Sequence, residues 1–367
     1  MSFAGETVRT LESNGLCRKL QIHSGELLNF STNDYLNLSS HPLVKRCAIE
    51  AVKLFGTGSR GSRLMAGNLS LHEGLEHQLA RLTGMETALV FGSGFLTNLG
   101  VLTSLAGRND VIFSDRLNHA SLVDGAIASR AEVRRYRHCS VEHLRDLLLS
   151  SGNTGRKIIV TDSVFSMDGD VAPLRDIFEL SVAEGCLLIV DEAHAIGVFG
   201  SGGGVCRGLG ICPDVITGTL SKALGGYGGF AACSSEMREY FVNRSRSFVY
   251  TTALPPASVG AAMGALEVIN STSGMGSSLL DLAADFRKLL VEKGFDTSGS
   301  VSQIVPIVVG ESSAALSLSA ALEEIGILAV AIRPPTVPAG TARLRFSVTL
   351  AHSPDDIIRT ADELKRL

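Results

Sequence analysis

The stretch CLLIVDEAHAIGVFGSGGGVCRGLGICPDVITGTLSKALGGYGGF, residues 186–230, decides the fold class of this chain. It contains two short apolar runs, 187–190 and 215–217, which have the length and composition of buried strands. The first run leads to Asp191, with His194 three residues later, and the second leads to Lys222 among glycines. We therefore expect two strand ends, one carrying an acid and one a lysine, that face each other across a glycine-rich loop.

Short apolar runs of the same kind recur through the first two thirds of the chain and alternate with helical patterns. Such alternation is typical of an α/β fold in which helices cover both faces of a mainly parallel sheet. We predict a seven-stranded sheet in a large domain. Its strands are 88–91, 111–113, 132–136, 157–161, 187–190, 215–217 and 229–233.

Polar residues follow directly after several of these strands. Because ligands bind outside the carboxyl ends of parallel strands, we expect these residues to converge on one side of the sheet. The segment Gly92-Ser93-Gly94-Phe95 lies between a strand and a helix, and backbone N–H groups at a helix N-terminus favour an anion. This segment is therefore either a phosphate cradle or an ordinary strand-to-helix turn. The converging residues are Ser93, 115–119, 163–168, Asp191, His194 and Lys222.

From Pro255 onward the pattern changes to that of a smaller α+β domain. We expect a helical stretch at 256–295, then strands at 305–309, 327–331 and 343–350, with helices at 314–325 and 354–367. The predicted division is an N-terminal segment (1–40), a large domain (41–255), a connecting helical stretch (256–295) and a small C-terminal domain (296–367).

Composition excludes several classes of function. The chain has 367 residues, of which 45% are hydrophobic, and its formal net charge of -4 gives no electrostatic basis for binding nucleic acid or membranes. Seven cysteines without a CxxC motif indicate reduced thiols in the cytoplasm, and we expect no metal site because no His/Cys cluster has metal-ligand spacing. Neither a secretory signal nor a membrane-spanning run is visible.

Gly56, Gly58 and Gly61 form a GxGxxG pattern, which we reject as a dinucleotide site. That fingerprint requires a strand before the glycines and a helix directly after them, whereas here a helix ending near residue 55 precedes them. The segment 56–68 is either a loop that needs positive φ angles or a loop that approaches a ligand. Its donors Ser59, Arg60, Ser62 and Arg63 favour the second interpretation.

The acid and the lysine suit one kind of cofactor chemistry. A carboxylate beneath a pyridine nitrogen keeps that nitrogen protonated, and a partly desolvated lysine can form a Schiff base with an aldehyde. Each residue also has a plainer interpretation. Asp191 could cap a helix, Lys222 could be a solvated surface charge, and His119 and His194 could cap or pack.

Four motifs, taken together, resemble the α-oxoamine synthases, which are pyridoxal-phosphate enzymes of the aspartate aminotransferase fold. They are Asp191-Glu192-Ala193-His194, Thr219-Leu220-Ser221-Lys222, Ser93-Gly94-Phe95 with Asn98, and Phe165-Ser166-Met167-Asp168-Gly169-Asp170. The resemblance extends from Asn33 to Arg345. Within the family, GSRGSRLMAGN and AIRPPTVPAGTARLR favour the biotin-pathway branch, which condenses L-alanine with a pimeloyl thioester on coenzyme A or acyl carrier protein.

The resemblance implies roles for individual residues. Lys222 would hold the cofactor and move the α-proton, Asp191 would pair with the ring nitrogen, and His119 would stack on the ring. Ser166 and His194 would hold the ring hydroxyl. The phosphate would be bound by Ser93, Gly94, Phe95 and Thr219, joined by Thr252 of the second subunit of a homodimer. Substrate carboxylates or the acyl carrier would contact Arg18, Arg333 and Arg345.

The sequence departs from the family pattern at two places, and two alternative functions remain open. The N-terminal stretch is shorter than the family pattern, leaving Arg18 and Lys19, and this puts the acyl-carrier contact in doubt. Leu220-Ser221 stands where close relatives often have Phe-Gly. A sister enzyme, such as glycine C-acetyltransferase, 5-aminolevulinate synthase or a serine-using synthase, would share the cofactor residues. A non-catalytic protein of the same fold is disfavoured because Lys222, Asp191 and His119 are all present.

Overall fold

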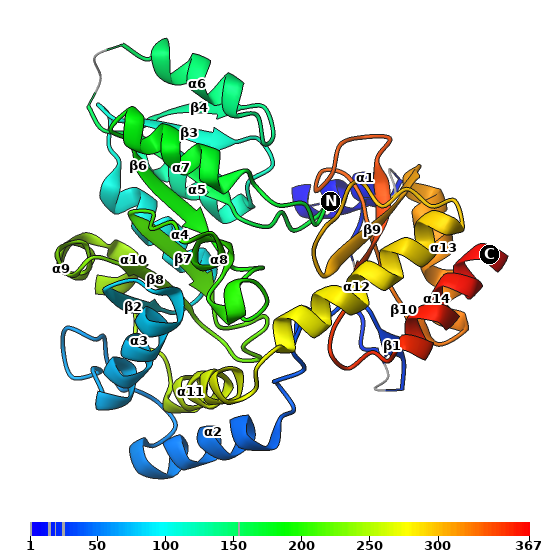
Figure 1. The fold of residues 1–367 in the computed structure, drawn as a ribbon, viewed down its shortest axis with the longest axis horizontal. Coiled ribbons are helices and arrows are strands. Elements are labelled where there is room, and N and C mark those ends of the chain that lie inside the picture. The colour runs from blue at the N-terminus through cyan, green and yellow to red at the C-terminus, as the bar shows by residue number, and fades with distance from the viewer. Residues whose placement is uncertain (1, 14–15, 19, 24–25, 153–154) are drawn as a thin grey trace. The chain divides into compact units, whose positions relative to one another are not determined.

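The chain divides into two compact units in the computed structural model, which describes residues 2–13, 16–18, 20–23, 26–152 and 155–367 (Figure 1). Lys19 therefore lies outside the described residues. Unit 1 comprises residues 1–33, 167–170 and 279–367, and unit 2 comprises residues 34–166 and 171–278. Unit 1 is thus assembled from both ends of the chain and one short internal segment.

Unit 2 contains the predicted seven-stranded sheet, in the order β2-β8-β7-β6-β5-β3-β4. β8 runs antiparallel to both of its neighbours, and the remaining neighbouring pairs are parallel. The prediction of a mainly parallel α/β sheet is confirmed. The strands are β2 (Thr87–Phe91), β3 (Val111–Asp115), β4 (Glu132–Tyr136), β5 (Lys157–Asp162), β6 (Leu187–Asp191), β7 (Val215–Thr219) and β8 (Gly229–Cys233).

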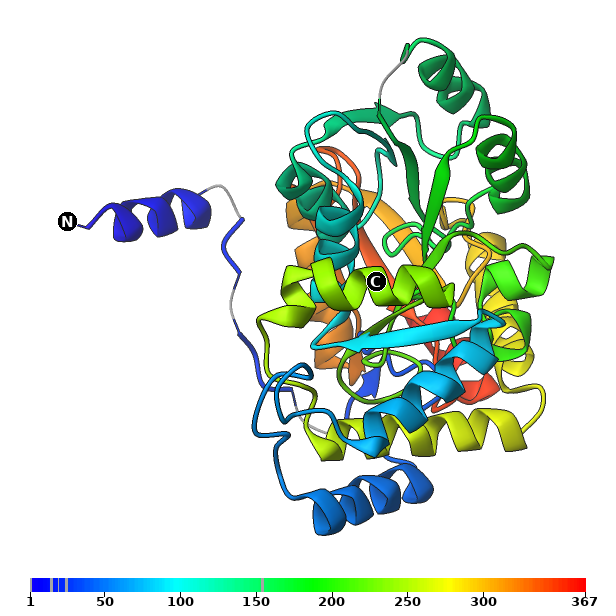
Figure 2. The ribbon, with the colours of Figure 1, turned by 90° about the vertical axis from the view of Figure 1, so that its left-hand side faces the viewer.

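Helices cover the sheet because its strands are apolar on both faces. Side chains such as Phe91, Ile112 and Ile189 are buried in one cluster with residues of α4, α5, α9 and α10. A second group of helices stacks in order, with α3 on β2, α11 on α3 and α2 along α11 (Figure 2). The helices are α2 (Pro42–Phe55), α3 (Ser70–Thr83), α4 (Gly94–Leu105), α5 (Ala120–Ser129), α6 (Val141–Leu149), α7 (Leu174–Ala183), α8 (Val205–Leu209), α9 (Ser235–Arg244), α10 (Arg246–Val249) and α11 (Pro256–Ser271).

Several helix boundaries follow from local chemistry. Pro42 lies in the first turn of α2, as predicted, because the N–H that proline lacks would have no partner there. The side chain of Ser93 accepts a hydrogen bond from Leu96 N and so caps α4. His119 caps α5 through its ring nitrogen, which accepts from Ser121 N. Both of these caps lie at the carboxyl edge of the sheet.

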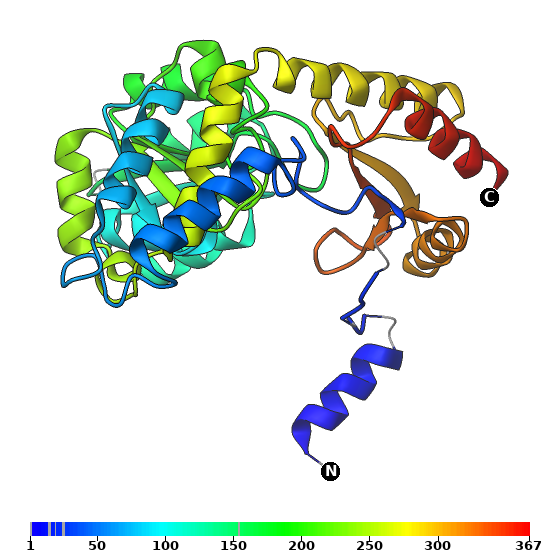
Figure 3. The same cartoon turned by 90° about the horizontal axis from the view of Figure 1, so that it is seen from below.

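Unit 1 is built on a three-stranded antiparallel sheet in the order β11-β12-β9, and β1 pairs with β10 beside it. The helices α12 and α14 lie side by side (Figure 3), and Lys293, the residue after α12, forms an ion pair with Asp362 on α14. The elements are α1 (Phe3–Ser13), β1 (Leu28–Asn29), α12 (Met275–Glu292), β9 (Ile304–Gly310), α13 (Ser312–Glu324), β10 (Ile327–Leu328), β11 (Val330–Ile332), β12 (Ala342–Ser347) and α14 (Pro354–Arg366). Among the described residues, no helix has the length and apolarity needed to cross a membrane.

The structure divides two elements that the sequence pattern presents as continuous. The stretch 256–295 contains two helices, because Gly274 adopts a φ of +82° between them and a helix cannot continue through that conformation. The predicted strand 327–331 is also wrong as one element. Leu328 pairs with β1, whereas Val330 pairs with β12, so the chain passes from one sheet to the other at Ala329.

Aromatic packing closes the core of unit 1. Phe30, Phe286 and Phe346 are fully buried, with ring centroids 5.4–5.6 Å apart, and the ring of His352 stacks on Phe30 at 4.0 Å. These residues come from both ends of the chain, so the core of this unit joins the two ends.

Replacing Phe346 with alanine should lower the free energy of unfolding by about 3–5 kcal/mol, because a buried ring is lost and a cavity remains. Urea titration followed by circular dichroism measures this change. As a control, Leu316→Ala on α13 removes a partly exposed side chain and should cost far less. Equal losses in the two variants would contradict the aromatic core described here.

Candidate active site

The ends of β5, β6 and β7 bring three polar residues next to one another in unit 2. Asp191 is the last residue of β6 and lies in register with Asp162 on β5 and Thr217 on β7. All three are buried. Since neighbouring parallel strands end at one edge of a sheet, the predicted convergence of strand-end residues holds for this part of the chain.

Asn98 on α4 holds the Asp191 carboxylate. Its amide nitrogen donates to Asp191 Oδ2 (2.6 Å) and to Ser121 Oγ (2.8 Å), and its amide oxygen accepts from Thr217 Oγ1 (2.7 Å). Ala193 N donates to the other carboxylate oxygen at 2.8 Å. The Asn98 side chain is therefore saturated, and the hydrogen bonds to Asp191 come from neutral donors.

The same network extends to His119. Ser121 Oγ lies 2.8 Å from His119 Nδ1, which also accepts from Ser121 N. Nδ1 is therefore an acceptor, and the ring is neutral with its proton on Nε2. Although part of His119 is exposed, surrounding protein desolvates the ring and lowers its pKa; Asp191 opposes this shift and Lys222 adds to it. A neutral, flat ring suits stacking on an aromatic cofactor, and the capping role foreseen as the alternative is present as well.

Lys222 and His194 are in direct contact. Lys222 Nζ lies 2.9 Å from His194 Nε2, and His194 Nδ1 lies 2.7 Å from the hydroxyl of Tyr35. Tyr35 is fully buried and His194 is nearly so, whereas Lys222 is half-buried. The lysine amine is thus positioned by a chain of hydrogen bonds that begins in a buried tyrosine, and it is not a freely solvated surface charge.

The N-terminus of α4 lies against the end of β7. A Cβ atom at Gly94 would be 3.2 Å from Thr219 Cβ, and one at Gly229 would be 2.5 Å from the backbone of Ser93. Gly229 is therefore required for β8 to pass this close to the helix N-terminus. Thr219 Oγ1 lies 2.7 Å from Ser221 Oγ. These contacts gather the backbone N–H groups of the helix terminus and two hydroxyls, which are donors of the kind that bind phosphate.

Asp162 is a buried carboxyl group that the sequence analysis did not single out. Its Oδ2 accepts the backbone N–H of His119 at 2.7 Å. Burial raises the pKa of Asp162 well above its ordinary value, the neighbouring Asp191 raises it further, and the hydrogen bond from His119 opposes the shift. Two carboxyl groups on adjacent strands thus differ in environment, and Asp162 is the one that burial disfavours as an anion.

Other predicted residues of unit 2 lie on more open surface. Ser166 is half-buried beyond the end of β5, and Phe95 and Thr252 are exposed. In the loop 56–68, two of the expected ligand donors serve the fold instead. Arg63 forms an ion pair with the buried Glu76 at 2.7 Å, and Ser59 donates to a backbone carbonyl.

The three predicted substrate arginines all belong to unit 1. Arg18 Nη2 donates to Thr336 Oγ1 at 3.1 Å, and both residues line, with Arg333, a cavity of about 910 Å³ in that unit. Arg345 lies buried on β12 and donates to Ser347 Oγ (2.8 Å) and Asn33 Oδ1 (3.2 Å). Arg345 on β12 is thus hydrogen-bonded to polar side chains, whereas Arg18 and Arg333 line an open cavity.

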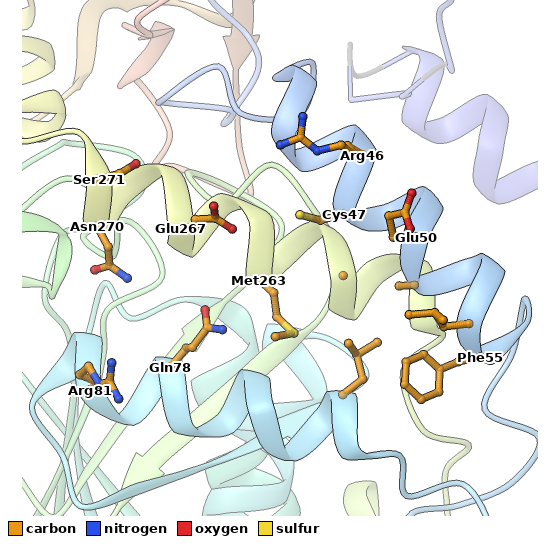
Figure 4. Close-up of a pocket in the computed structure, with 14 residues that line it drawn as sticks. Arg46, Cys47, Glu50, Phe55, Gln78, Arg81, Met263, Glu267, Asn270 and Ser271 are labelled. Atoms are coloured by element: carbon orange, nitrogen blue, oxygen red, sulfur yellow. The ribbon is translucent and has the colours of Figure 1, made fainter.

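Unit 2 also has a hollow of about 610 Å³ between α2, α3 and α11 (Figure 4). Its rim carries Arg46 and Arg81 together with Glu50 and Glu267, so its charges balance, and its floor is apolar. None of the residues predicted to bind cofactor or substrate lines this hollow. We therefore place the candidate active site at the strand ends and not in this hollow.

The residues at the strand ends fit pyridoxal phosphate. A buried carboxylate with neutral donors can accept a protonated ring nitrogen, a half-buried amine can reach an aldehyde, and a helix N-terminus can receive a phosphate. Asn98 and Tyr35 complete this arrangement. Asn98 lies in a motif quoted for the resemblance and Tyr35 lies near the start of the matching region, but their roles depend on partners that are far away in sequence.

Asn98→Ala should lower the free energy of unfolding of the cofactor-free chain by about 1–3 kcal/mol, because it removes three hydrogen bonds to the buried side chains of Asp191, Thr217 and Ser121. Urea titration measures the loss. The matched control is Asn270→Ala, which removes an exposed asparagine on α11 and should change little.

Asp162→Asn should change the pH dependence of stability. Since the folded-state pKa of Asp162 is raised, the folded chain binds more protons than the unfolded chain between the ordinary value of 3.8 and the raised value. The contribution of Asp162 to stability is therefore greatest below 3.8 and is lost as pH rises through this window. Relative to Asp162→Asn, the wild-type chain should become less stable with rising pH in urea titrations at several pH values. A constant difference would contradict the shift.

Comparison with known proteins places this geometry in a family. Residues 25–364 match the model of aminotransferase class I and II. The chain is 46% identical to the 8-amino-7-oxononanoate synthase of Geobacter sulfurreducens, over 100% of this chain and 97% of that protein. It is 43% identical to the enzyme of the same name from Citrifermentans bemidjiense, over 100% and 98%.

Solved structures agree in fold. A serine palmitoyltransferase from S. paucimobilis with bound PLP-myriocin aldimine has a TM-score of 0.92 at 29% identity, over 99% of this chain and 96% of that one. The 8-amino-7-oxononanoate synthase from Francisella tularensis has a TM-score of 0.80 at 30% identity, over 93% and 97%. This chain therefore belongs to the class I and II aminotransferase family and, within it, to the pyridoxal-phosphate-dependent 8-amino-7-oxononanoate synthases.

Proposed function

We propose that this chain condenses L-alanine with a pimeloyl thioester, carried on coenzyme A or acyl carrier protein, to give 8-amino-7-oxononanoate, carbon dioxide and the free thiol. The observation that carries the proposal is the contact of 2.9 Å between Lys222 Nζ and His194 Nε2 beside the buried Asp191, in a chain 46% identical to a synthase of that name. The reaction supplies a carbon skeleton for biotin.

The residues at the strand ends have distinct proposed roles in binding the cofactor. Asp191 would pair with the ring nitrogen, His119 would stack on the ring, and His194 and Ser166 would hold the ring hydroxyl. When bound, pyridoxal phosphate supplies an electron sink that stabilises negative charge on the α-carbon of the substrate. The phosphate would be bound by Ser93, Gly94, Phe95 and Thr219.

Lys222 is proposed as the group that moves protons. Its amine would take the α-proton of alanine, and the α-carbon would then add to the thioester carbonyl and expel the thiol. Loss of carbon dioxide from the same carbon leaves a position to which Lys222 returns a proton. His194 keeps the amine near this carbon, and Tyr35 fixes the orientation of His194. His119, neutral through its lowered pKa, is a proposed donor to the carbonyl oxygen.

The substrate carboxylates are assigned to arginines of unit 1, since a guanidinium binds a carboxylate through two hydrogen bonds. Arg18 lines a cavity together with Arg333 and is proposed for contact with the acyl chain or its carrier. Two arginines are candidates for binding the amino-acid carboxylate. One is Arg345, which is buried and hydrogen-bonded to Ser347 and Asn33, and the other is Arg333.

A homodimer in the cytoplasm is part of the same proposal. Thr252 is exposed in a segment that also exposes Tyr250, and Met65 of the loop 56–68 is exposed as well. Thr252 would contribute to the phosphate site of the second subunit. The seven cysteines are free thiols, which fits a reducing compartment.

A sister activity is the second candidate, because serine palmitoyltransferases share the fold at 29–30% identity. The curated relatives with 43–46% identity favour the alanine-using reaction. Mass spectrometry of products from pimeloyl-coenzyme A and pimeloyl-acyl carrier protein, each with L-alanine, glycine or L-serine, separates the candidates. Product from glycine or serine, and none from alanine, would overturn the assignment.

Lys222→Ala should abolish product formation and the absorbance of the lysine-linked cofactor, because Lys222 is the amine proposed to form that linkage and to move the α-proton. The control is Lys53→Ala, which removes an exposed lysine of α2 and should leave both readouts unchanged. Retained lysine-linked absorbance in Lys222→Ala would refute the role of this residue.

A further inference from the structure

Three side chains with metal-binding atoms, none of which was assigned to the cofactor, meet at the carboxyl ends of β3 and β4. Asp115 is the last residue of β3, and His138 and Cys139 follow β4 by two and three residues. β3 and β4 are neighbouring parallel strands, and Asp115 lies in register with Tyr136. A carboxylate oxygen, an imidazole nitrogen and a thiol sulfur all lie within 4.8 Å of one another.

The separations of these atoms suit one cation. His138 Nδ1 lies 3.0 Å from Asp115 Oδ1, and Cys139 Sγ lies 3.7 Å from the same nitrogen. A tetrahedral zinc ion with bonds of 2.0–2.3 Å holds its N, O and S ligands about 3.3–3.6 Å apart. Asp115 Oδ1 and His138 Nδ1 are already close to this separation. Cys139 Sγ lies 3.6 Å from His138 Nε2, almost as far as from Nδ1, so a rotation of the Cys139 side chain must bring the sulfur to the Nδ1 side of the ring to complete the coordination sphere.

The backbone directs the two neighbouring side chains to the same place. Consecutive residues of an extended strand point to opposite faces. Cys139, however, adopts a φ of +53°, in the left-handed region that only glycine and asparagine enter readily. This turn carries the thiol to within 3.7 Å of the His138 ring, so the contact is made by conformation and not by sequence spacing.

The ligand atoms are held in position by groups outside the cluster. Asp115 is buried and accepts the backbone N–H groups of Leu117 (2.8 Å to Oδ1) and Cys139 (2.8 Å to Oδ2). The edge of the Phe165 ring packs against His138 at 4.4 Å. His138 retains 20% of its side-chain exposure, so solvent reaches the open side of the cluster.

We propose that Asp115, His138 and Cys139 bind one divalent cation of the zinc class, with water as the remaining ligand. A thiolate and an imidazole select zinc over magnesium and calcium, which prefer oxygen ligands. On binding, the thiol proton leaves to solvent, the ring proton of His138 moves from Nδ1 to Nε2, and the cation replaces the hydrogen bond between His138 and Asp115. The bound cation would join the ends of β3 and β4 and stabilise the folded chain.

The experiment uses the tag-free, cofactor-loaded protein after removal of metal with a chelator. Zinc is added, excess is removed by gel filtration, and the zinc retained per chain is measured. The wild-type chain should retain a stoichiometric amount, and His138→Gln and Cys139→Asn should weaken binding by about 10-fold or more. Asparagine tolerates the left-handed conformation at position 139, so this variant removes the thiolate while the turn remains.

A matched control and a spectroscopic readout make the result specific. Cys212→Ser removes an exposed cysteine beside Met85 and should bind zinc as the wild type does. Cobalt in place of zinc should give tetrahedral d–d bands, at longer wavelengths than the absorbance of the cofactor, in the wild type and not in Cys139→Asn. The proposal fails if the wild type retains no zinc, or if Cys139→Asn, with cofactor absorbance equal to the wild type, retains as much.

Discussion

The arrangement at the centre of unit 2 depends on a charged carboxylate, Asp191, that is held in the protein interior by neutral donors. An isolated buried charge costs several kcal/mol, and hydrogen bonds must offset that cost. Asn98 provides one of these bonds and is itself held by Thr217 and Ser121. One amide thereby connects β6, β7, α4 and α5, so the register of the strands and the place of the carboxylate are set together.

The fold was largely predictable because its determinants are local. Most strands of the large sheet are short apolar runs, whereas the edge strand β4 reads EVRRY. Most helices begin at a capping residue or a proline, so neighbouring residues suffice to recognise most elements. The predictions failed where the structure depends on contacts between residues that are far apart in the sequence. Residues 327–331 form two strands because Leu328 pairs with Asn29, 299 residues away, and Val330 pairs with Arg345, 15 residues away. No local pattern in the sequence indicates this difference.

The site could be predicted in part for the same reason. Asp191, His194 and Lys222 stand next to apolar runs and were visible as strand-end residues. Tyr35 lies 159 residues from His194, and Arg63 and Ser59 carry donors that a ligand could use as well as the protein could. Composition cannot tell a ligand-binding arginine from one that neutralises a buried glutamate such as Glu76. The role of such an arginine depends on the group that it contacts, and this contact is known only from the three-dimensional structure.

Unit 1 is built from separate segments of the chain, and this sets the order in which its contacts can form during synthesis. β1 pairs with β10, and Phe30 stacks on His352, so residues near the N-terminus complete their contacts only with residues near the C-terminus. During synthesis from the ribosome, unit 2 has all of its residues available once position 278 has emerged, whereas residues 28–30 wait for almost the entire remaining chain. Phe30, although synthesised early, is thus among the last core residues of unit 1 to be buried, and the nascent chain must keep it from other partners in the meantime.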